Sequence, residues 1–311
     1  MPNSNYSIAY IGGSGRSGST LLELILGELD DWVAIGEVKE LYKYSLDENM
    51  PCGCGTPLNV CDFWSSIHES LNSKGVDYSE LASINQNTTR SRNMLQFLVD
   101  SSYRKKAGWL KLVEAIRQTY DEIAALSGAK VIVDSSKSAI HLALLVDAFG
   151  EDRVRLIHQV RDPRGVSYSW SKNIKKIKTK HGDVKFPKRP FIESGVRWLL
   201  ENYALERSAK NIPCQLMRYE TFTSDPARVL SEVLSALGFD ENIEHVINAS
   251  GVVNCYSNNS SHAIGGNPMR QNAETITIRP DNNWRAKLSS YDKIRLGAIT
   301  YPLLRRYGYH F

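Results

Sequence analysis

The chain has no run of about 18 consecutive apolar residues, which is the length that a membrane-spanning helix requires. Residues 1–5 are polar and lead directly into a short apolar segment at residues 8–11. A secretory signal peptide or an N-terminal membrane anchor would need a longer hydrophobic segment at this place. We therefore expect a cytoplasmic protein with no membrane partner.

A strong net charge is also absent. The 311 residues include 38 basic and 34 acidic side chains, which leaves a formal charge of +4. Proteins that bind nucleic acids usually carry a larger and more clustered positive charge, so we expect no nucleic-acid partner. A small anionic ligand is compatible with this mild charge.

Cysteine is scarce and odd in number, since the chain contains five. This usage fits a reducing compartment better than a disulfide framework. Cys52, Cys54 and Cys61 nevertheless lie together in a segment rich in turn-forming residues. Zinc would require a fourth ligand, and the only candidate nearby is His68. We therefore expect no metal here but a folded loop, which a labile disulfide could close.

A glycine-rich segment at residues 12–20 stands out among the features that are present. The apolar segment before it favours a strand, and the leucines after it, at residues 21–26, have helical spacing. A loop between a strand and a helix points backbone N–H groups at the helix start, where phosphate binds well. This predicts an anion-binding loop; a tight turn without a ligand is the alternative.

The spacing of this loop narrows the choice of anion. Gly13 and Gly18 stand as in a Walker A loop, but Ser19 occupies the position of the Walker lysine. The positive charge lies instead at Arg16, inside the loop. We therefore do not expect an ordinary P-loop NTPase.

A second candidate phosphate site begins at Arg161. It follows an apolar segment, residues 154–160, and Pro163 suits the first turn of a helix after it. Arg161 can hold a phosphate through two hydrogen bonds, and Ser169, eight residues on, can add a hydroxyl donor. The alternative is a structural junction in which Arg161 pairs with Asp162. His158, in the middle of the strand, is expected to be a packed core residue.

Together these two motifs resemble those of sulfotransferases that use 3′-phosphoadenosine 5′-phosphosulfate (PAPS), of the bacterial type related to carbohydrate and tyrosylprotein sulfotransferases. In that family the Arg-Ser-Gly-Ser-Thr loop binds the 5′-phosphosulfate and the Arg-Asp-Pro segment with its later serine binds the 3′-phosphate. The resemblance implies PAPS as cofactor and adenosine 3′,5′-bisphosphate as product. It implies cofactor contacts at Gly15, Arg16, Ser17, Gly18, Ser19, Thr20, Arg161 and Ser169.

The same resemblance implies catalytic roles for three residues. Glu37, after a short apolar segment at residues 32–36, would accept the proton of the acceptor hydroxyl, and Lys137 and Arg16 would neutralise charge on the sulfuryl group. Glu37 could instead serve as a helix cap or dipole partner, with Glu40 as the fallback base. A metal is not part of this site.

Later segments match the family less closely. By resemblance Tyr219 contacts the adenine, and Gly266, Asn267 and Arg270 belong to a late loop over the nucleotide. The basic segment 172–189 is a solvated loop by default, and the alternatives are a lid over the cofactor or a selector for an acidic acceptor. Residues 79–127 have the spacing of two amphipathic helices.

Segments of strand and helix character alternate along the whole chain, without a linker or an internal repeat. We therefore expect a single α/β domain over residues 1–311, with the P-loop-like three-layer fold of this family: a mainly parallel central sheet flanked by helices. The expected activity is in-line transfer of the sulfuryl group to a hydroxyl, or an amine, of a small-molecule or glycan acceptor. A nucleotide kinase-like phosphotransferase and a non-catalytic nucleotide-binding module are the alternatives. The sequence predicts neither the acceptor nor the oligomeric state.

Overall fold

A computed structural model describes residues 5–47, 50–172, 177–179, 182–184, 188–248, 251–255, 261–265 and 275–310. The strands are β1 (Ser7–Gly12), β2 (Trp32–Gly36), β3 (Val131–Lys137), β4 (Val154–Val160), β5 (Ile177–Thr179), β6 (Gly182–Val184), β7 (Cys214–Arg218), β8 (Val252–Asn254) and β9 (Thr275–Thr277). Five of them form a parallel sheet in the order β2-β3-β1-β4-β7, whereas β5 with β6 and β8 with β9 form small antiparallel pairs.

Helices connect the strands. The α-helices are α1 (Ser19–Leu26), α2 (Leu41–Tyr44), α3 (Asp62–Ser73), α4 (Tyr78–Thr89), α5 (Met94–Val99), α6 (Ala107–Ser127), α7 (Ala139–Phe149), α8 (Pro163–Ser171), α9 (Phe191–Ser208), α10 (Tyr219–Ser224), α11 (Pro226–Ala236), α12 (Trp284–Lys287) and α13 (Ser290–Arg306). Short 3₁₀ helices are η1 (Val38–Glu40), η2 (Leu58–Val60), η3 (Ser91–Asn93) and η4 (Tyr103–Lys105). In the described part of the chain, no helix combines the length and apolar character needed to cross a membrane.

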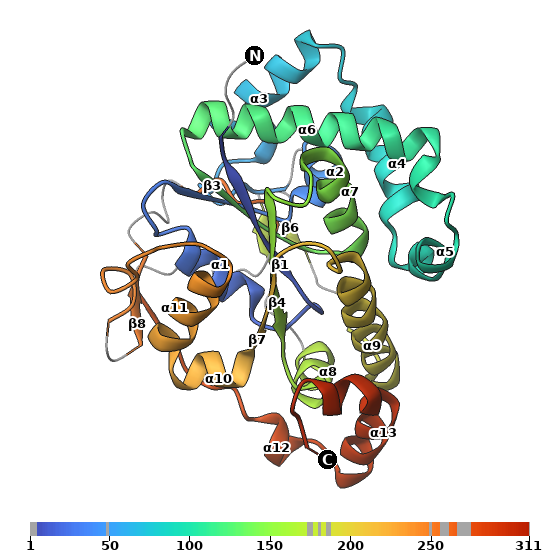
Figure 1. Cartoon of the computed structure of the whole chain (residues 1–311), viewed down its shortest axis with the longest axis vertical. Helices are drawn as coiled ribbons and strands as arrows, with labels where there is room; N and C mark the ends of the chain where they lie inside the picture. The colour runs from blue at the N-terminus through green and yellow to red at the C-terminus, as the bar shows by residue number, and fades with distance from the viewer. Residues whose placement is uncertain are drawn as a thin grey trace.

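Both faces of the sheet are buried, as parallel sheets require. Successive side chains of β1 point to opposite faces: Ile8 and Tyr10 belong to one hydrophobic cluster, and Ala9 and Ile11 belong to another. Helices α6, α7 and α9 contribute to the first cluster, and α1 and α11 to the second, so the sheet lies between two helical layers (Figure 1). This confirms the predicted α/β fold with a mainly parallel central sheet.

The region 79–127 differs from the sequence-based expectation, because it holds three α-helices, α4, α5 and α6, instead of two. Asp100 accepts hydrogen bonds from the backbone N–H and the hydroxyl of Ser102, at 2.9 and 2.6 Å, and this turn separates α5 from α6. Helix α5 is only six residues long. It buries Met94 and leaves Leu95 and Val99 exposed.

Helices α8, α9 and α13 pack together beside the carboxyl end of β4. Trp198 of α9 is fully buried there, and its indole N–H donates to the backbone oxygen of Arg161 at 3.0 Å. His158 lies 2.9 Å from the amide oxygen of Asn202, and burial lowers the pKa of His158. The interpretation of His158 as a core residue is confirmed.

Replacing the buried indole tests this packing. Trp198→Phe should lower the free energy of unfolding by about 1–3 kcal/mol, because the carbonyl of Arg161 loses a buried donor. Trp32→Phe is the matched control: its indole N–H donates to the half-buried Glu241, which water can solvate instead. Urea unfolding measures both variants. An equal decrease in the free energy of unfolding in both variants would contradict a stabilising role of the buried hydrogen bond from Trp198 to Arg161.

Candidate functional site

Five predicted site elements lie at the carboxyl edge of the sheet, in the order of its strands. Glu37 follows β2, Lys137 ends β3, the loop 13–18 follows β1, Arg161 follows β4 and Tyr219 follows β7. Neighbouring strands are about 4.8 Å apart, so this row spans about 19 Å. Ligands of parallel α/β sheets bind at this edge.

All five elements line one cavity of about 610 Å³. Among the described residues, seven basic side chains face it but only three acidic ones. The surplus of positive charge favours an anionic ligand. The basic residues are Arg16, Lys39, Lys137, Arg161, Arg189, Arg197 and Arg279, and the acidic ones are Glu37, Glu201 and Asp281.

The glycine-rich loop adopts left-handed backbone conformations before α1. Arg16 has a φ of 75° and Gly18 a φ of 93°. A Cβ atom at Gly18 would lie 2.8 Å from the ring of Tyr219, so only glycine fits between the loop and that ring. The N-cap residue of α1 is Gly18, which makes no side-chain cap, and the N-terminus of a helix favours an anionic ligand.

Several buried polar atoms have no hydrogen-bond partner within the described ranges, and each motif contributes at least one of them: the hydroxyl of Ser17 and Nε of Arg161. Buried polar groups in proteins are almost always paired, and a ligand commonly supplies the missing partner. Both donors belong to the motifs that predict phosphate binding. Arg161 lines the cavity, whereas Ser17 is buried and is absent from the described cavity wall. The two motifs together fit a ligand with two separated phosphate-type groups.

Arg161 is held in place by three contacts. Its guanidinium lies 4.4 Å from the centre of the Tyr219 ring, one nitrogen donates to the backbone oxygen of Arg16 at 3.3 Å, and the other donates to Asp281. The distance to the Asp281 carboxylate is 3.1 Å. Burial alone would raise the pKa of Asp281, but hydrogen bonds from Asn283 and Arg161 outweigh it and lower that pKa.

The alternative for Arg161, a pair with Asp162, is not what the structure has. Asp162 pairs with Arg164 at 2.7 Å and caps α8 through the Arg164 backbone N–H. The carboxylate beside Arg161 is Asp281, which the sequence did not indicate because it lies 120 residues away.

Glu37 lies between two lysines at the other end of the row. Lys137 Nζ is 2.7 Å from Glu37 Oε1 and also donates to the backbone oxygen of Ser135 at 2.9 Å. Lys39 Nζ is 3.7 Å from Glu37 Oε2. Burial would lower the pKa of Lys39, but the carboxylates of Glu37 and Glu40 raise it. Lys39 was missed in the sequence, although it stands only two residues after Glu37.

Of the two candidate bases, only Glu37 lines the cavity. Glu40 approaches Lys39 at 3.9 Å but is absent from the described cavity wall. The backbone N–H of Glu37 donates to the backbone oxygen of Ile264 at 2.8 Å, which holds the residue at the end of β2.

The remaining predicted cofactor contacts have the following places. Gly15, Arg16, Ser19, Thr20 and Ser169 line the cavity. The guanidinium of Arg16 lies 4.7 Å from the centre of the Trp170 ring, and burial lowers the pKa of Arg16. Gly266, Asn267 and Arg270 lie outside the described residues, as do residues 173–176, 180–181 and 185–187 of the basic segment 172–189.

The fold is shared with solved structures. The chain is similar to the sulfotransferase domain from the curacin biosynthetic pathway, with 17% identity, a TM-score of 0.58 and coverage of 98% of this chain and 99% of that domain. It is also similar to the sulfotransferase domain from the Synechococcus PCC 7002 olefin synthase, with 17% identity, a TM-score of 0.52 and coverage of 96% of each chain. No curated protein matches the chain.

At the level of sequence, a model of the sulfotransferase family matches residues 9–242. The match begins in β1, includes the glycine-rich loop, Glu37, Lys137 and Arg161, and ends after α11. It covers well over half of the 311 residues. The chain therefore belongs to the sulfotransferase family.

Proposed function

We propose that the protein transfers the sulfuryl group of PAPS to a hydroxyl of a small-molecule or glycan acceptor. The observation that carries this proposal is the row of residues along the sheet edge, with two candidate phosphate sites and a carboxylate beside two lysines. One extended ligand can contact every member of this row. The two similar structures are domains from the curacin biosynthetic pathway and from an olefin synthase, which supports a small-molecule acceptor over a glycan.

The donor would lie with its nucleotide toward β4 and β7. Arg161 and Ser169 would bind the 3′-phosphate, the ring of Tyr219 would contact the adenine, and the N–H groups of the glycine-rich loop would bind the 5′-phosphosulfate. PAPS supplies a sulfuryl group on a good leaving group, adenosine 3′,5′-bisphosphate. This orientation points the sulfuryl group toward Glu37 and Lys137.

Glu37 then accepts the proton of the acceptor hydroxyl. At the same time the hydroxyl oxygen of the acceptor forms a bond to sulfur, and the bond between sulfur and the bridging oxygen of PAPS breaks. The carboxylate is held in place by Lys137 and by the backbone of Ile264. Lys137 has three N–H donors, so it can keep its contact with Glu37 and still bind a sulfuryl oxygen. Arg16 and the loop N–H groups stabilise the charge that develops on the leaving group.

Nucleotide preference tests the class of ligand. We expect adenosine 3′,5′-bisphosphate to bind at least about tenfold more tightly than ATP with Mg²⁺, because Arg161 and the loop supply two separate phosphate sites. Isothermal titration calorimetry measures both affinities. A preference for ATP would refute the proposal in favour of a phosphotransferase. Tight binding without transfer to any acceptor would point to a nucleotide-binding module.

Replacing the candidate base tests the chemistry. Glu37→Gln should reduce turnover by about 10²- to 10⁴-fold with an acceptor identified by screening with radiolabelled PAPS, because the amide cannot take the proton. The affinity for adenosine 3′,5′-bisphosphate should change little. Glu40→Gln, which alters a neighbouring carboxylate outside the cavity, is the matched control. Transfer that persists within a few-fold in Glu37→Gln would place the base elsewhere.

A substitution at the opposite end tests the orientation of the donor. Arg161→Lys should weaken binding of adenosine 3′,5′-bisphosphate by about 10- to 100-fold, since lysine cannot form bidentate hydrogen bonds with phosphate. AMP, which lacks the 3′-phosphate, should bind the variant and the wild type alike. Arg164→Lys is the control, because Arg164 pairs with Asp162 away from the cavity. Equal weakening of AMP binding in Arg161→Lys argues against the assignment.

A further inference from the structure

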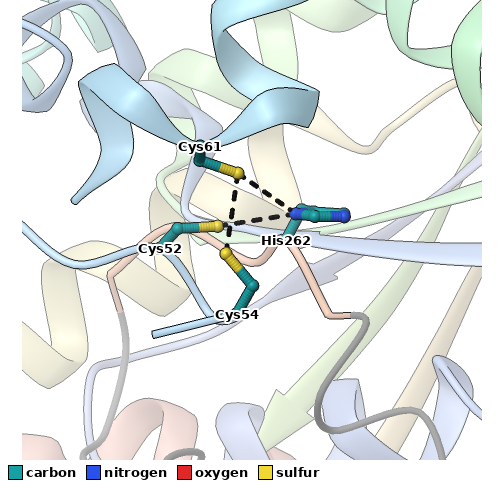
Figure 2. Close-up of side chains that lie close together, drawn as sticks. All are labelled: Cys52, Cys54, Cys61 and His262. Carbon is teal, nitrogen blue, oxygen red and sulfur yellow. Dashed lines mark hydrogen bonds between the residues drawn. The ribbon is translucent and has the colours of Figure 1, made fainter. Parts of the chain in front are cut away.

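Four side chains with metal-binding atoms meet beyond the end of β2. Cys52, Cys54 and Cys61 come from one loop, and His262 comes from a segment about 200 residues later (Figure 2). Their three sulfur atoms and one ring nitrogen all lie within 4.8 Å of one another. The sequence offered His68 as the fourth ligand, but His68 stacks on Tyr78 instead.

Three of the six distances within this cluster come close to the edges of a tetrahedron around zinc, and the other three do not exceed 4.8 Å. Zinc lies about 2.3 Å from sulfur and about 2.0–2.1 Å from a histidine nitrogen, which gives edges of about 3.8 Å between sulfurs and about 3.6 Å between sulfur and nitrogen. Nδ1 of His262 lies 3.3 Å from the sulfur of Cys61 and 3.7 Å from that of Cys52. The sulfurs of Cys54 and Cys61 are 3.6 Å apart.

We propose that Cys52, Cys54, Cys61 and His262 bind one Zn²⁺ ion as a structural site. Four protein ligands leave no open position for a substrate or water, which is the mark of a structural zinc site. None of the four lines the described cavity wall, so the ion would not contact the reacting atoms. Binding would release the three thiol protons to solvent and leave the histidine neutral.

The surroundings of the ligands hold them in position. The backbone N–H of Cys52 donates to the oxygen of Thr56 at 2.8 Å, which closes the tight turn that carries the first two cysteines. The backbone oxygen of His262 accepts from the indole of Trp64 at 2.7 Å. The ring of Phe63 stacks on the imidazole with 4.6 Å between ring centres and an angle of 5°. Such contacts from outside the ligand set orient metal ligands and raise metal affinity.

The zinc site would also support the position of Glu37. Two residues after His262, Ile264 forms an antiparallel bridge with Cys52 and a parallel bridge with Gly36. Its backbone oxygen accepts the N–H of Glu37. The ion would therefore fasten the loop 50–61 to the segment that pairs with the end of β2. Zinc would thus help to hold Glu37 in position. The catalytic importance of that position rests on the proposed function, whereas the metal site itself does not.

Metal content of the purified full-length chain tests the site directly. Inductively coupled plasma mass spectrometry should find about one zinc per chain. Cys54→Ser and His262→Ala should lose the metal on dialysis, whereas His262→Cys should keep it, because four cysteines also bind zinc. Cys214→Ser and His68→Ala, which change residues outside the cluster, should keep the wild-type content.

Cobalt provides a second measurement that does not depend on activity. The wild type loaded with Co²⁺ should show the visible absorption of tetrahedral cobalt and the charge-transfer band of thiolate ligands, and His262→Cys should restore a band that His262→Ala weakens. A wild type that takes up neither zinc nor cobalt would overturn the proposal. So would iron in place of zinc, or a disulfide between Cys54 and Cys61 in the native chain.

The effect on transfer separates the two proposals. Removing zinc should lower turnover by about tenfold or more, because Glu37 loses its fixed position, and leave the affinity for adenosine 3′,5′-bisphosphate unchanged. If nucleotide binding and transfer fail but zinc is present, the metal site stands and the proposed activity falls. If transfer is found but zinc is absent, the reverse holds. Turnover that does not respond to zinc removal would limit the ion to a role in stability.

Discussion

The position of Glu37 depends on how the edge of the sheet at β2 is covered. An edge strand presents unpaired backbone groups, and here Ile264 pairs with them: its N–H donates to Ile35 at 2.9 Å, and its oxygen accepts from Glu37 at 2.8 Å. Gly36 makes this approach possible, because a Cβ atom there would lie 2.2 Å from the oxygen of Ile264. A segment from late in the chain therefore completes the site at its outer end.

The charges around Glu37 explain why a half-buried carboxylate is stable there. Lys137 and Lys39 both approach it, and Glu40 also lies 3.9 Å from Lys39, so two lysines face two carboxylates. The surplus of positive charge belongs to the described cavity wall as a whole, where seven basic side chains face three acidic ones, and burying such a surplus costs free energy unless an anion approaches. A sulfuryl or phosphate group would supply that anion, and its binding would stabilise the folded protein by linkage.

The sequence predicted those parts of the site that depend on neighbours along the chain. The glycine-rich loop and Arg161 each follow a strand and precede a helix, so short motifs predict the local fold and suggest the proposed phosphate-type ligand. Asp281 and His262 could not be found in this way, because their partners, Arg161 and the cysteines, lie 120 and about 200 residues away. No local pattern records a contact that only the folded chain makes. Lys39 is different, since its place beside Glu37 could have been noticed.

The residues that the sequence predicted and those that it missed can be compared at the two ends of the site. The end away from Glu37 is built from the central strands β1 and β4, the edge strand β7 and the residues directly after them, where register within the sheet restricts each backbone position. The end beside Glu37 combines the edge strand β2 with residues such as Thr89 and Met94 from helical segments, while the loop 50–61 and the segment 261–265 support β2 from outside the described cavity wall. Loops and helix ends tolerate substitution better than central strands. Under the proposed function, the end beside Glu37 could therefore change with the acceptor while the other end keeps the geometry that the nucleotide requires.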